Sequence, residues 1–233
     1  MANRKAHRPF GAVTVVPYGH NMRVIPRKIL DETDWSALEN RNGPSYPDTP
    51  TLLSGLTSDD LPAVEAALFH LSHGLIEYPN AYSAAVPAAQ YVAAVLDDPH
   101  SNDLLVQGRP LRAALLTWLA GVVDSVSDAR ERDFIELAGY SPMDYPTSTF
   151  RKIREIRPQL FSAVAAHLSD HDPVVRQEAV AAAVVIAMAP ELTLRRAMLM
   201  PAVRDVLAVS SSPAHRRLAT TAIQAWSDDS GPA

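Results

Sequence analysis

Residues 170–179 read Asp-His-Asp-Pro-Val-Val-Arg-Gln-Glu-Ala, and the prediction of the fold starts from this turn. Asp172 is suited to cap a helix, because its side chain accepts hydrogen bonds from the first free backbone N–H groups. Pro173 fits the first turn of that helix, where its missing N–H has no intrahelical partner. On both sides of the turn, apolar residues recur three and four positions apart, which is typical of amphipathic helices. The stretch therefore predicts two helices joined by a short capped turn.

Turns of similar chemistry recur along the chain, and Asp60 and Ser212 are the corresponding caps of two of them. Each turn follows a leucine that closes one helix, and each of these helices carries a proline that we expect near its start. The leucines are Leu56, Leu96, Leu168 and Leu207, and the prolines are Pro50, Pro87, Pro158 and Pro201. The leucines lie 40, 72 and 39 residues apart. Two intervals give a period of about 40 residues, and the middle one is a period with about thirty inserted residues.

The period, the turn chemistry and the helix pairing resemble HEAT repeats, whose units are two antiparallel helices. The resemblance covers roughly residues 49–227. It implies an all-α fold, a right-handed α-solenoid of about four HEAT-like helical pairs. It also implies that Arg176 reaches an aspartate of a neighbouring turn and joins one repeat to the next.

A narrower resemblance rests on Trp-Ser-Ala-Leu at 35–38, Gly-Pro-Ser-Tyr-Pro-Asp-Thr-Pro-Thr-Leu-Leu at 43–53, and Ile-Glu-Tyr-Pro-Asn-Ala-Tyr-Ser-Ala-Ala-Val-Pro-Ala-Ala at 76–89. These segments look like the opening of HEAT-repeat proteins of high-GC bacteria. Some members of that group look like immunity proteins of toxin systems, so the resemblance implies a bacterial, immunity-like protein.

The chain divides into three parts in our prediction. Residues 1–47 are punctuated by proline and glycine and are expected to form an irregular basic N-terminal arm. Residues 48–227 form the solenoid, with an insertion at about 127–150 that reads as a short charged helix followed by an aromatic, proline-bearing loop. Residues 228–233 are expected to be a disordered tail.

Composition and charge exclude several functions. The 233 residues include no cysteine, so a disulfide, a thiolate nucleophile and a cysteine-ligated metal are all excluded. The net charge of −5 is uneven: residues 1–30 hold six basic and no acidic residues, whereas residues 31–110 hold twelve acidic and two basic ones. Nucleic acid is therefore disfavoured except through the N-terminal arm, and a basic protein partner is favoured.

The sequence gives no sign of a membrane protein or of a secreted one. No apolar run reaches the roughly 18–20 residues of a membrane-spanning helix, and the first 30 residues lack the pattern of a secretory signal. We therefore expect a cytoplasmic protein of unknown oligomeric state.

Three side chains have spacings compatible with a metal site. His70, His73 and Glu77 follow one another at intervals of three and four, so one helix face can present all of them. No further convergent ligand can be named, and an ordinary polar ridge is the favoured interpretation. We expect no metal and no cofactor.

Enzymatic alternatives have weaker support. No Gly-x-Ser-x-Gly motif is present, which disfavours a nucleophilic hydrolase. Helical-repeat DNA glycosylases that act on alkylated DNA are similar in size, and Trp118, Asp124, Arg112 and Arg154 are candidates for their aromatic, aspartate and arginine residues. The acidic charge of residues 31–110 opposes this alternative. A third alternative is a scaffold or regulator that contacts nucleic acid through the basic arm.

We predict a non-enzymatic protein–protein interaction module, with an immunity-like or regulatory role, that binds a basic partner through a concave acidic surface. Acidic side chains steer the partner and exposed tyrosines anchor it. The candidate partner surface comprises Asp59, Glu65, His70, His73, Glu77, Tyr78, Tyr82, Asp97, Asp98, Tyr140 and Tyr145.

Overall fold

The computed structural model describes residues 24–43, 49–77 and 80–228. These residues are mostly helical and form almost no sheet, which confirms the all-α class. The α-helices of the described residues are α1 Val24–Glu32, α2 Thr49–Ser54, α3 Leu61–His70, α4 Ala85–Val95, α5 Pro99–Asp103, α6 Leu111–Asp124, α7 Asp128–Ala138, α8 Thr149–Ala165, α9 Pro173–Ala187, α10 Thr193–Val209 and α11 Pro213–Asp228.

Shorter elements join these helices. They are the 3-10 helices η1 Trp35–Ala37, η2 Gly55–Thr57, η4 Pro142–Asp144 and η5 Pro190–Leu192, and the π-helical turn η3 Leu71–Leu75, which continues α3. Two antiparallel hairpins pair β1 Ile76–Glu77 with β2 Asn80–Ala81, and β3 Leu105–Val106 with β4 Arg109–Pro110.

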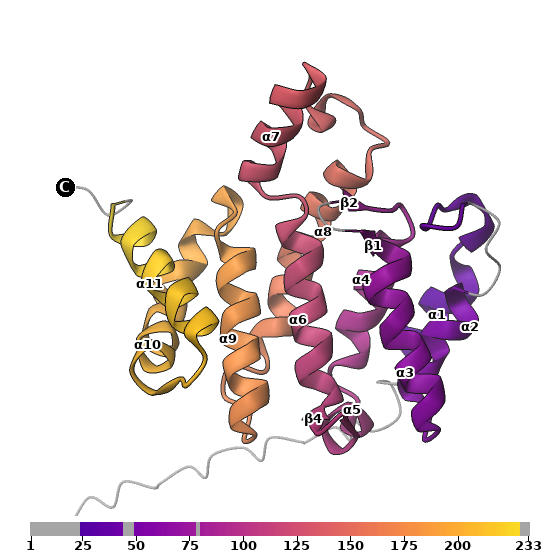
Figure 1. Ribbon diagram of the computed structural model, residues 1–233, viewed down its shortest axis with the longest axis horizontal. Helices are drawn as coiled ribbons and strands as arrows, with labels where there is room; N and C mark the ends of the chain where they lie inside the picture. The colour runs from indigo at the N-terminus through magenta and orange to yellow at the C-terminus, as the bar shows by residue number, and fades with distance from the viewer. Residues whose placement is uncertain (1–23, 44–48, 78–79, 229–233) are drawn as a thin grey trace, which may run out of the picture.

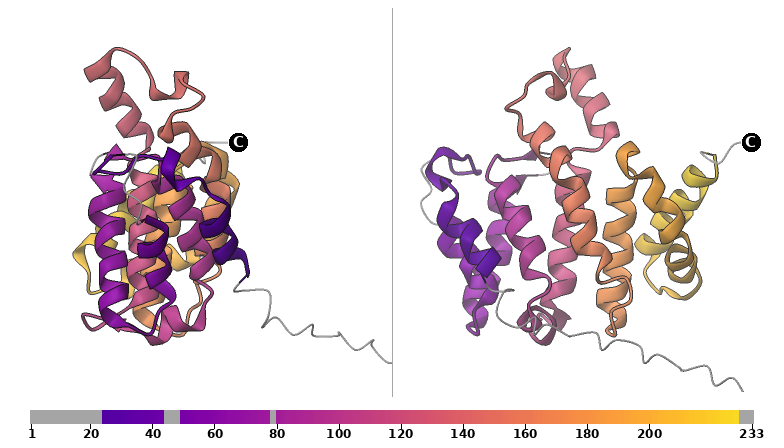
Figure 2. Two further views of the ribbon diagram at one scale, coloured as in Figure 1. Left: turned by 90° about the vertical axis from the view of Figure 1, so that its right-hand side faces the viewer. Right: turned by 180° about the vertical axis from the view of Figure 1, so that it is seen from behind.

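The helices stack in two layers (Figure 1). α3, α6, α9 and α11 follow one another in the layer nearer the viewer, while α1, α4 and α8 lie behind them (Figure 2). Contacts run along the layers, from α6 to α9 to α11 and from α1 to α4 to α8, and across them, from α4 and α8 to α6 and from α8 to α9. α10 packs on α9 and α11 and closes one end of the stack. Several of the packed pairs, such as α6 with α9 and α1 with α4, are thus not consecutive in the sequence.

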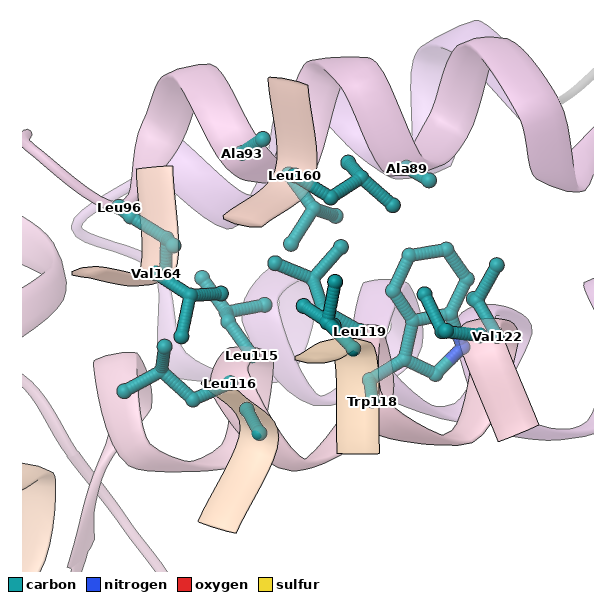
Figure 3. Packing of buried hydrophobic residues seen from close by; sticks show 14 of the residues in the cluster. Ala89, Ala93, Leu96, Leu115, Leu116, Trp118, Leu119, Val122, Leu160 and Val164 are labelled. Atoms are coloured by element: carbon teal, nitrogen blue, oxygen red, sulfur yellow. The ribbon is translucent and has the colours of Figure 1, made fainter. Parts of the chain in front are cut away.

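The core lies between the layers and is centred on α6. Leu115, Leu116 and Leu119 are fully buried and meet side chains of α4 and α8 (Figure 3). The facing residues of α4 include Ala89 and Ala93, whose small side chains let the helices approach closely. The apolar spacing read from the sequence is thus the spacing of residues that the two layers bury.

The helix ends follow the predicted turn chemistry in part. The Asp172 side chain accepts hydrogen bonds from the amides of Val174 and Val175 and caps α9. Ser212 accepts one from the amide of His215, at 3.3 Å, at the start of α11. Asp60 precedes α3, but its side chain makes no capping hydrogen bond, so that predicted cap is wrong.

Two of the expected helix starts are also wrong. Pro158 lies inside α8 and Pro201 inside α10. α8 begins earlier because Ser148 caps it by accepting a hydrogen bond from the Arg151 amide. A proline inside a helix removes one backbone hydrogen bond, and both helices tolerate this loss.

An arginine joins two turns of the stack, although not the predicted one. Arg176 donates to the carbonyl oxygen of Asp170 in its own turn. Arg112, at the start of α6, instead reaches the Asp170 carboxylate at 3.1 Å and also donates to the carbonyl oxygens of Leu96 and Asp98. The contact between turns expected of Arg176 is therefore made by Arg112, because α6 packs directly against α9.

Part of the segment predicted to be an irregular arm is helical, since α1 and η1 lie within it. α1 packs on α4, with Ile29 and Leu30 against the core, and the Trp35 indole N–H donates to the carbonyl oxygen of Leu30 at 3.0 Å. The prolines and glycines of this segment do not indicate α1, which forms because Ile29 and Leu30 pack on an apolar surface. The first 23 residues and residues 229–233 lie outside the described residues.

Residues of the predicted insertion form α7 and η4, which project from the stack (Figure 1). In the part of the chain that the structure describes, no single helix combines the length and the apolar character needed to cross a membrane.

Candidate partner-binding site

A groove of about 770 Å³ lies between α3 and α6 and is bounded below by the β3–β4 hairpin. We call it the α3–α6 groove. Its lining combines aromatic, apolar and a few polar side chains, a composition typical of binding sites. The lining residues are Glu65, Ala66, Leu68, Phe69, Ser72, His73, Val106, Gln107, Arg109, Ala114, Thr117 and Trp118.

One face of α3 forms the wall of this groove. Glu65, Phe69 and His73 are spaced four residues apart, so they lie above one another on the helical segment. The rings of Phe69 and His73 stack with centroids 4.3 Å apart, although the Phe69 side chain is 65% exposed. The opposite face buries Val64 and Ala67 in the core. The wall is therefore rigid while its aromatic rings face solvent.

The floor comes from α6 and from the hairpin. The Trp118 indole is almost completely buried among the core residues (Figure 3). It donates a hydrogen bond to the carbonyl oxygen of Leu71 at 2.8 Å, which joins α6 to the end of α3. At the hairpin tip, Gln107 has a φ of 52° and is followed by Gly108 with a φ of 76°. Among the described residues, Gln107 is the one non-glycine residue in the left-handed region. Gln107 and Gly108 form the two-residue turn of this hairpin, which requires the left-handed conformation at both positions.

The free charge of the groove is negative. Glu65 makes no ion pair or side-chain hydrogen bond with the residues that the structure describes. Arg109, the one lysine or arginine in the lining, lies 2.6 Å from the Glu178 carboxylate of α9. Glu178 also accepts a hydrogen bond from the Thr117 hydroxyl and lies 3.4 Å from His215. Glu178, which lies outside the groove, thus neutralises the charge of Arg109. The carboxylate of Glu65 therefore gives the groove a negative charge.

The histidines and Glu77 of the predicted polar ridge have separate surroundings. His70 is buried, and its Nε2 lies 3.0 Å from the Thr49 hydroxyl. His73 stacks on Phe69, whereas Glu77 accepts a hydrogen bond from Tyr82 at 2.8 Å and pairs with Arg41 at 3.3 Å. Within residues 24–43, 49–77 and 80–228, no group of three or more such side chains is placed to hold a metal ion.

Hydrogen bonding to Glu77 raises the pKa of the Tyr82 hydroxyl above its usual value, and the weak burial and the charge of that carboxylate add to the shift. Tyr78, which was predicted with Tyr82 as an anchor, lies outside the described residues.

The remaining predicted acids lie at turns and have intramolecular partners. Asp98 accepts a hydrogen bond from the His100 amide and caps α5. Asp59 lies 3.5 Å from the His100 ring, and Asp97 lies 3.5 Å from the His167 ring. The structure therefore places Glu65 and His73 in one groove and these three aspartates in the turns.

Tyr140 and Tyr145 lie in the projecting insertion. Their rings pack edge to face at 5.4 Å, and Tyr140 packs in the same way on Phe134 of α7. Both tyrosines are about half exposed. They form a separate aromatic cluster and do not line the α3–α6 groove.

The residues proposed for a glycosylase do not converge. Arg112 begins α6 and Asp124 ends it, so about 18 Å of helix separates them. Arg112 is bound to Asp170, and Arg154 is bound to Asp128 and Glu131 of α7. With Trp118 held in the core, the four side chains cannot surround one base.

Phe69, Gln107 and Trp118 were missing from the predicted site. Phe69 carried a usable signal, because it is an aromatic residue midway between two polar residues of one helix face. Gln107 and Trp118 carried no such signal, since their place in the groove depends on how α6 and its hairpin pack against α3.

Comparison of the chain with family models, with curated proteins and with solved structures gives no match.

Proposed function

We propose that the protein is a non-enzymatic protein–protein interaction module that binds a basic partner through the α3–α6 groove. The observation that carries this proposal is the free Glu65 carboxylate one helical turn from the exposed Phe69 ring. A lysine or arginine side chain of the partner stacks on Phe69 and pairs with Glu65. An adjacent apolar side chain of the partner contacts the exposed Ala66 and the partly buried Leu68.

The two-layer stack supports the finer part of the proposal, a right-handed α-solenoid of HEAT-like pairs. α6 with α8, α8 with α9 and α10 with α11 pack as neighbouring helices, and an arginine joins successive turns. Such stacks leave long surfaces available to protein partners. The resemblance of the sequence to immunity-like HEAT-repeat proteins supports an immunity-like or regulatory role. In that role, binding blocks or regulates the activity of the partner.

The test measures binding of fluorescent peptides to the full chain by anisotropy. A peptide with alternating arginine and leucine is compared with one in which glutamate replaces arginine. We expect the basic peptide to bind more tightly, and added salt to weaken it because screening reduces exposed charge attraction. Glu65→Lys and Phe69→Ala each weaken binding about tenfold or more, as expected for central contacts.

Matched controls lie elsewhere on the surface. Asp205→Lys makes the same charge change on α10, and Leu194→Ala removes an exposed apolar side chain from α10. Both are expected to bind like the unmodified protein. Equal affinity for the acidic and the basic peptide, or equal loss in the Glu65 and Asp205 variants, contradicts the proposal.

A further inference from the structure

The ring of His73 has a fixed orientation in the α3–α6 groove. It packs on the Phe69 ring with the planes 16° apart, and its Nδ1 lies 3.1 Å from the carbonyl oxygen of Phe69. A carbonyl oxygen only accepts hydrogen bonds, so Nδ1 carries the proton of the neutral ring and Nε2 carries the lone pair. The side chain is exposed, and its Nε2 has no hydrogen-bond partner among the described residues.

Few charged groups face this ring. The ionisable residues that line the groove are Glu65 from α3, His73 from η3 and Arg109 from the β3–β4 hairpin, whereas α6 contributes none. Glu178 of α9 neutralises Arg109. While His73 is neutral, the lining therefore keeps the negative charge of Glu65. Protonation of His73 adds a positive charge and reduces the net charge of the lining to zero.

The cation of a basic partner lies close to His73 when it occupies the groove. In the proposed function this cation stacks on Phe69 and pairs with Glu65, one helical turn away. His73 lies one turn away in the other direction, and its ring covers one face of Phe69. A cation on the free face of Phe69 is then within about 10 Å of the imidazole, the screening length at 0.1 M salt. A protonated His73 therefore repels the cation that Glu65 attracts.

We propose that His73 makes the binding of the basic partner depend on pH, so that the groove binds the partner while His73 is neutral and weakens its hold when His73 is protonated. This inference rests on the proposed function, because it concerns the regulation of the same groove. Histidine is the side chain that ordinarily changes its charge between pH 5 and pH 8, and carboxyl groups ordinarily titrate at lower pH. Mild acid thus removes the net charge of the groove.

The test measures anisotropy of the arginine–leucine peptide with the full chain at pH 7.5 and at pH 5.5. The peptide is acetylated and amidated, so it does not titrate in this interval. The unmodified protein is expected to bind about threefold more weakly at pH 5.5, the size of one exposed charge interaction. His73→Gln, which stays neutral, is expected to bind equally at both pH values. His73→Lys, which stays charged, is expected to bind weakly at both.

The dependence on salt separates this effect from a general effect of acid on the protein. At pH 7.5 added salt weakens the binding, whereas at pH 5.5 it has little effect because the net charge of the groove is gone. His73→Gln keeps the salt effect at both pH values. His171→Gln, which changes an exposed histidine of the turn before α9, is the matched control and keeps the pH dependence of the unmodified protein. Far-UV circular dichroism checks that each variant is folded at both pH values.

Equal affinity of the unmodified protein at the two pH values overturns this inference, while binding of the basic peptide at both leaves the proposed function in place. A loss at pH 5.5 that persists in His73→Gln also overturns it. Such a loss assigns the pH dependence to another group, such as His215, which lies 3.4 Å from the Glu178 carboxylate. Absence of binding at every pH overturns the inference together with the proposed function.

Discussion

Arg112 holds two turns of the stack together from a buried position. The side chains of Arg112 and Asp170 are 9% and 5% exposed, and the hydroxyl of Ser101 accepts a further hydrogen bond from Arg112. Removing one member of such a pair leaves a charge in the interior without its partner, which costs more than the pair itself contributes.

Arg112→Met is therefore expected to lower the free energy of unfolding by about 3 kcal/mol. Urea denaturation followed by circular dichroism measures the change. Arg27→Met is the control, because Arg27 pairs with Asp31 on the surface of α1, where a pair contributes about 0.5 kcal/mol or less. Similar losses in the two variants contradict a structural role for the Arg112–Asp170 contact.

His167 lies in the same buried cluster and makes stability depend on pH. Burial lowers the pKa of His167, and the Arg112 cation lowers it further, against the opposing effects of Asp97 and Asp170. The unfolded chain then binds more protons than the folded chain below about pH 6.5, so the free energy of unfolding falls as the pH drops through that range.

His167→Gln removes this titration. We expect the difference in urea midpoint between pH 7.5 and pH 5.5 to be smaller in the variant than in the unmodified protein. His171→Gln, which changes an exposed histidine of the same turn, is the control and should keep the larger difference. An unchanged pH dependence in the His167 variant contradicts the assignment.

At the scale of elements, two glycines have opposite environments. A Cβ on Gly55 would lie 2.6 Å from the carbonyl oxygen of Ala63, because η2 packs directly on α3. Gly121 lies inside α6, and a Cβ there meets nothing within 4 Å. The backbone of Ala63 leaves no room for a side chain at position 55, so glycine is required there. The structure shows no such requirement at position 121.

Gly55→Ala is therefore expected to destabilise the protein, by about 1–3 kcal/mol as for other overpacked sites. Gly121→Ala is expected to stabilise it by up to about 1 kcal/mol, since alanine favours the helix over glycine. Thermal unfolding of the two variants checks the signs. Two variants with changes of the same sign contradict this interpretation.

The sequence predicted elements better than it predicted sites. Periodic apolar residues and capped turns located most of the helices, because burial between two layers imposes that spacing. α1 escaped prediction because its packing surface comes from α4, which is distant in sequence. Glu65 and His73, two residues of the predicted partner surface, line the α3–α6 groove, whereas the side chains of Asp97 and Asp98, which belong to the same predicted surface, contact groups inside the chain. The charge pattern of a sequence does not reveal which acidic side chains already bind groups within the turns of the chain.

At the scale of the whole molecule, stability is expected to be uneven. α6 and α9 are covered by helices on several sides, whereas α7 buries no residue. Amides in exposed, weakly packed segments exchange through local opening, and core amides exchange through larger unfolding events.

Hydrogen exchange followed by mass spectrometry of the full chain tests this gradient. We expect amides of α7 to exchange fastest among the helices of ten or more residues, and those of α6 and α9 to exchange slowest. Exchange of α7 as slow as that of α6 contradicts the gradient.

The contact between Arg109 and Glu178 has a consequence for selectivity. Because Glu178 belongs to α9 and does not line the α3–α6 groove, the polarity of that groove is set from a neighbouring helix. A change at Glu178 uncovers a cation beside Glu65 without altering the shape of the groove. Glu178→Gln is thus expected to shift the preference of the groove from basic toward acidic ligands, although Glu178 does not line the groove.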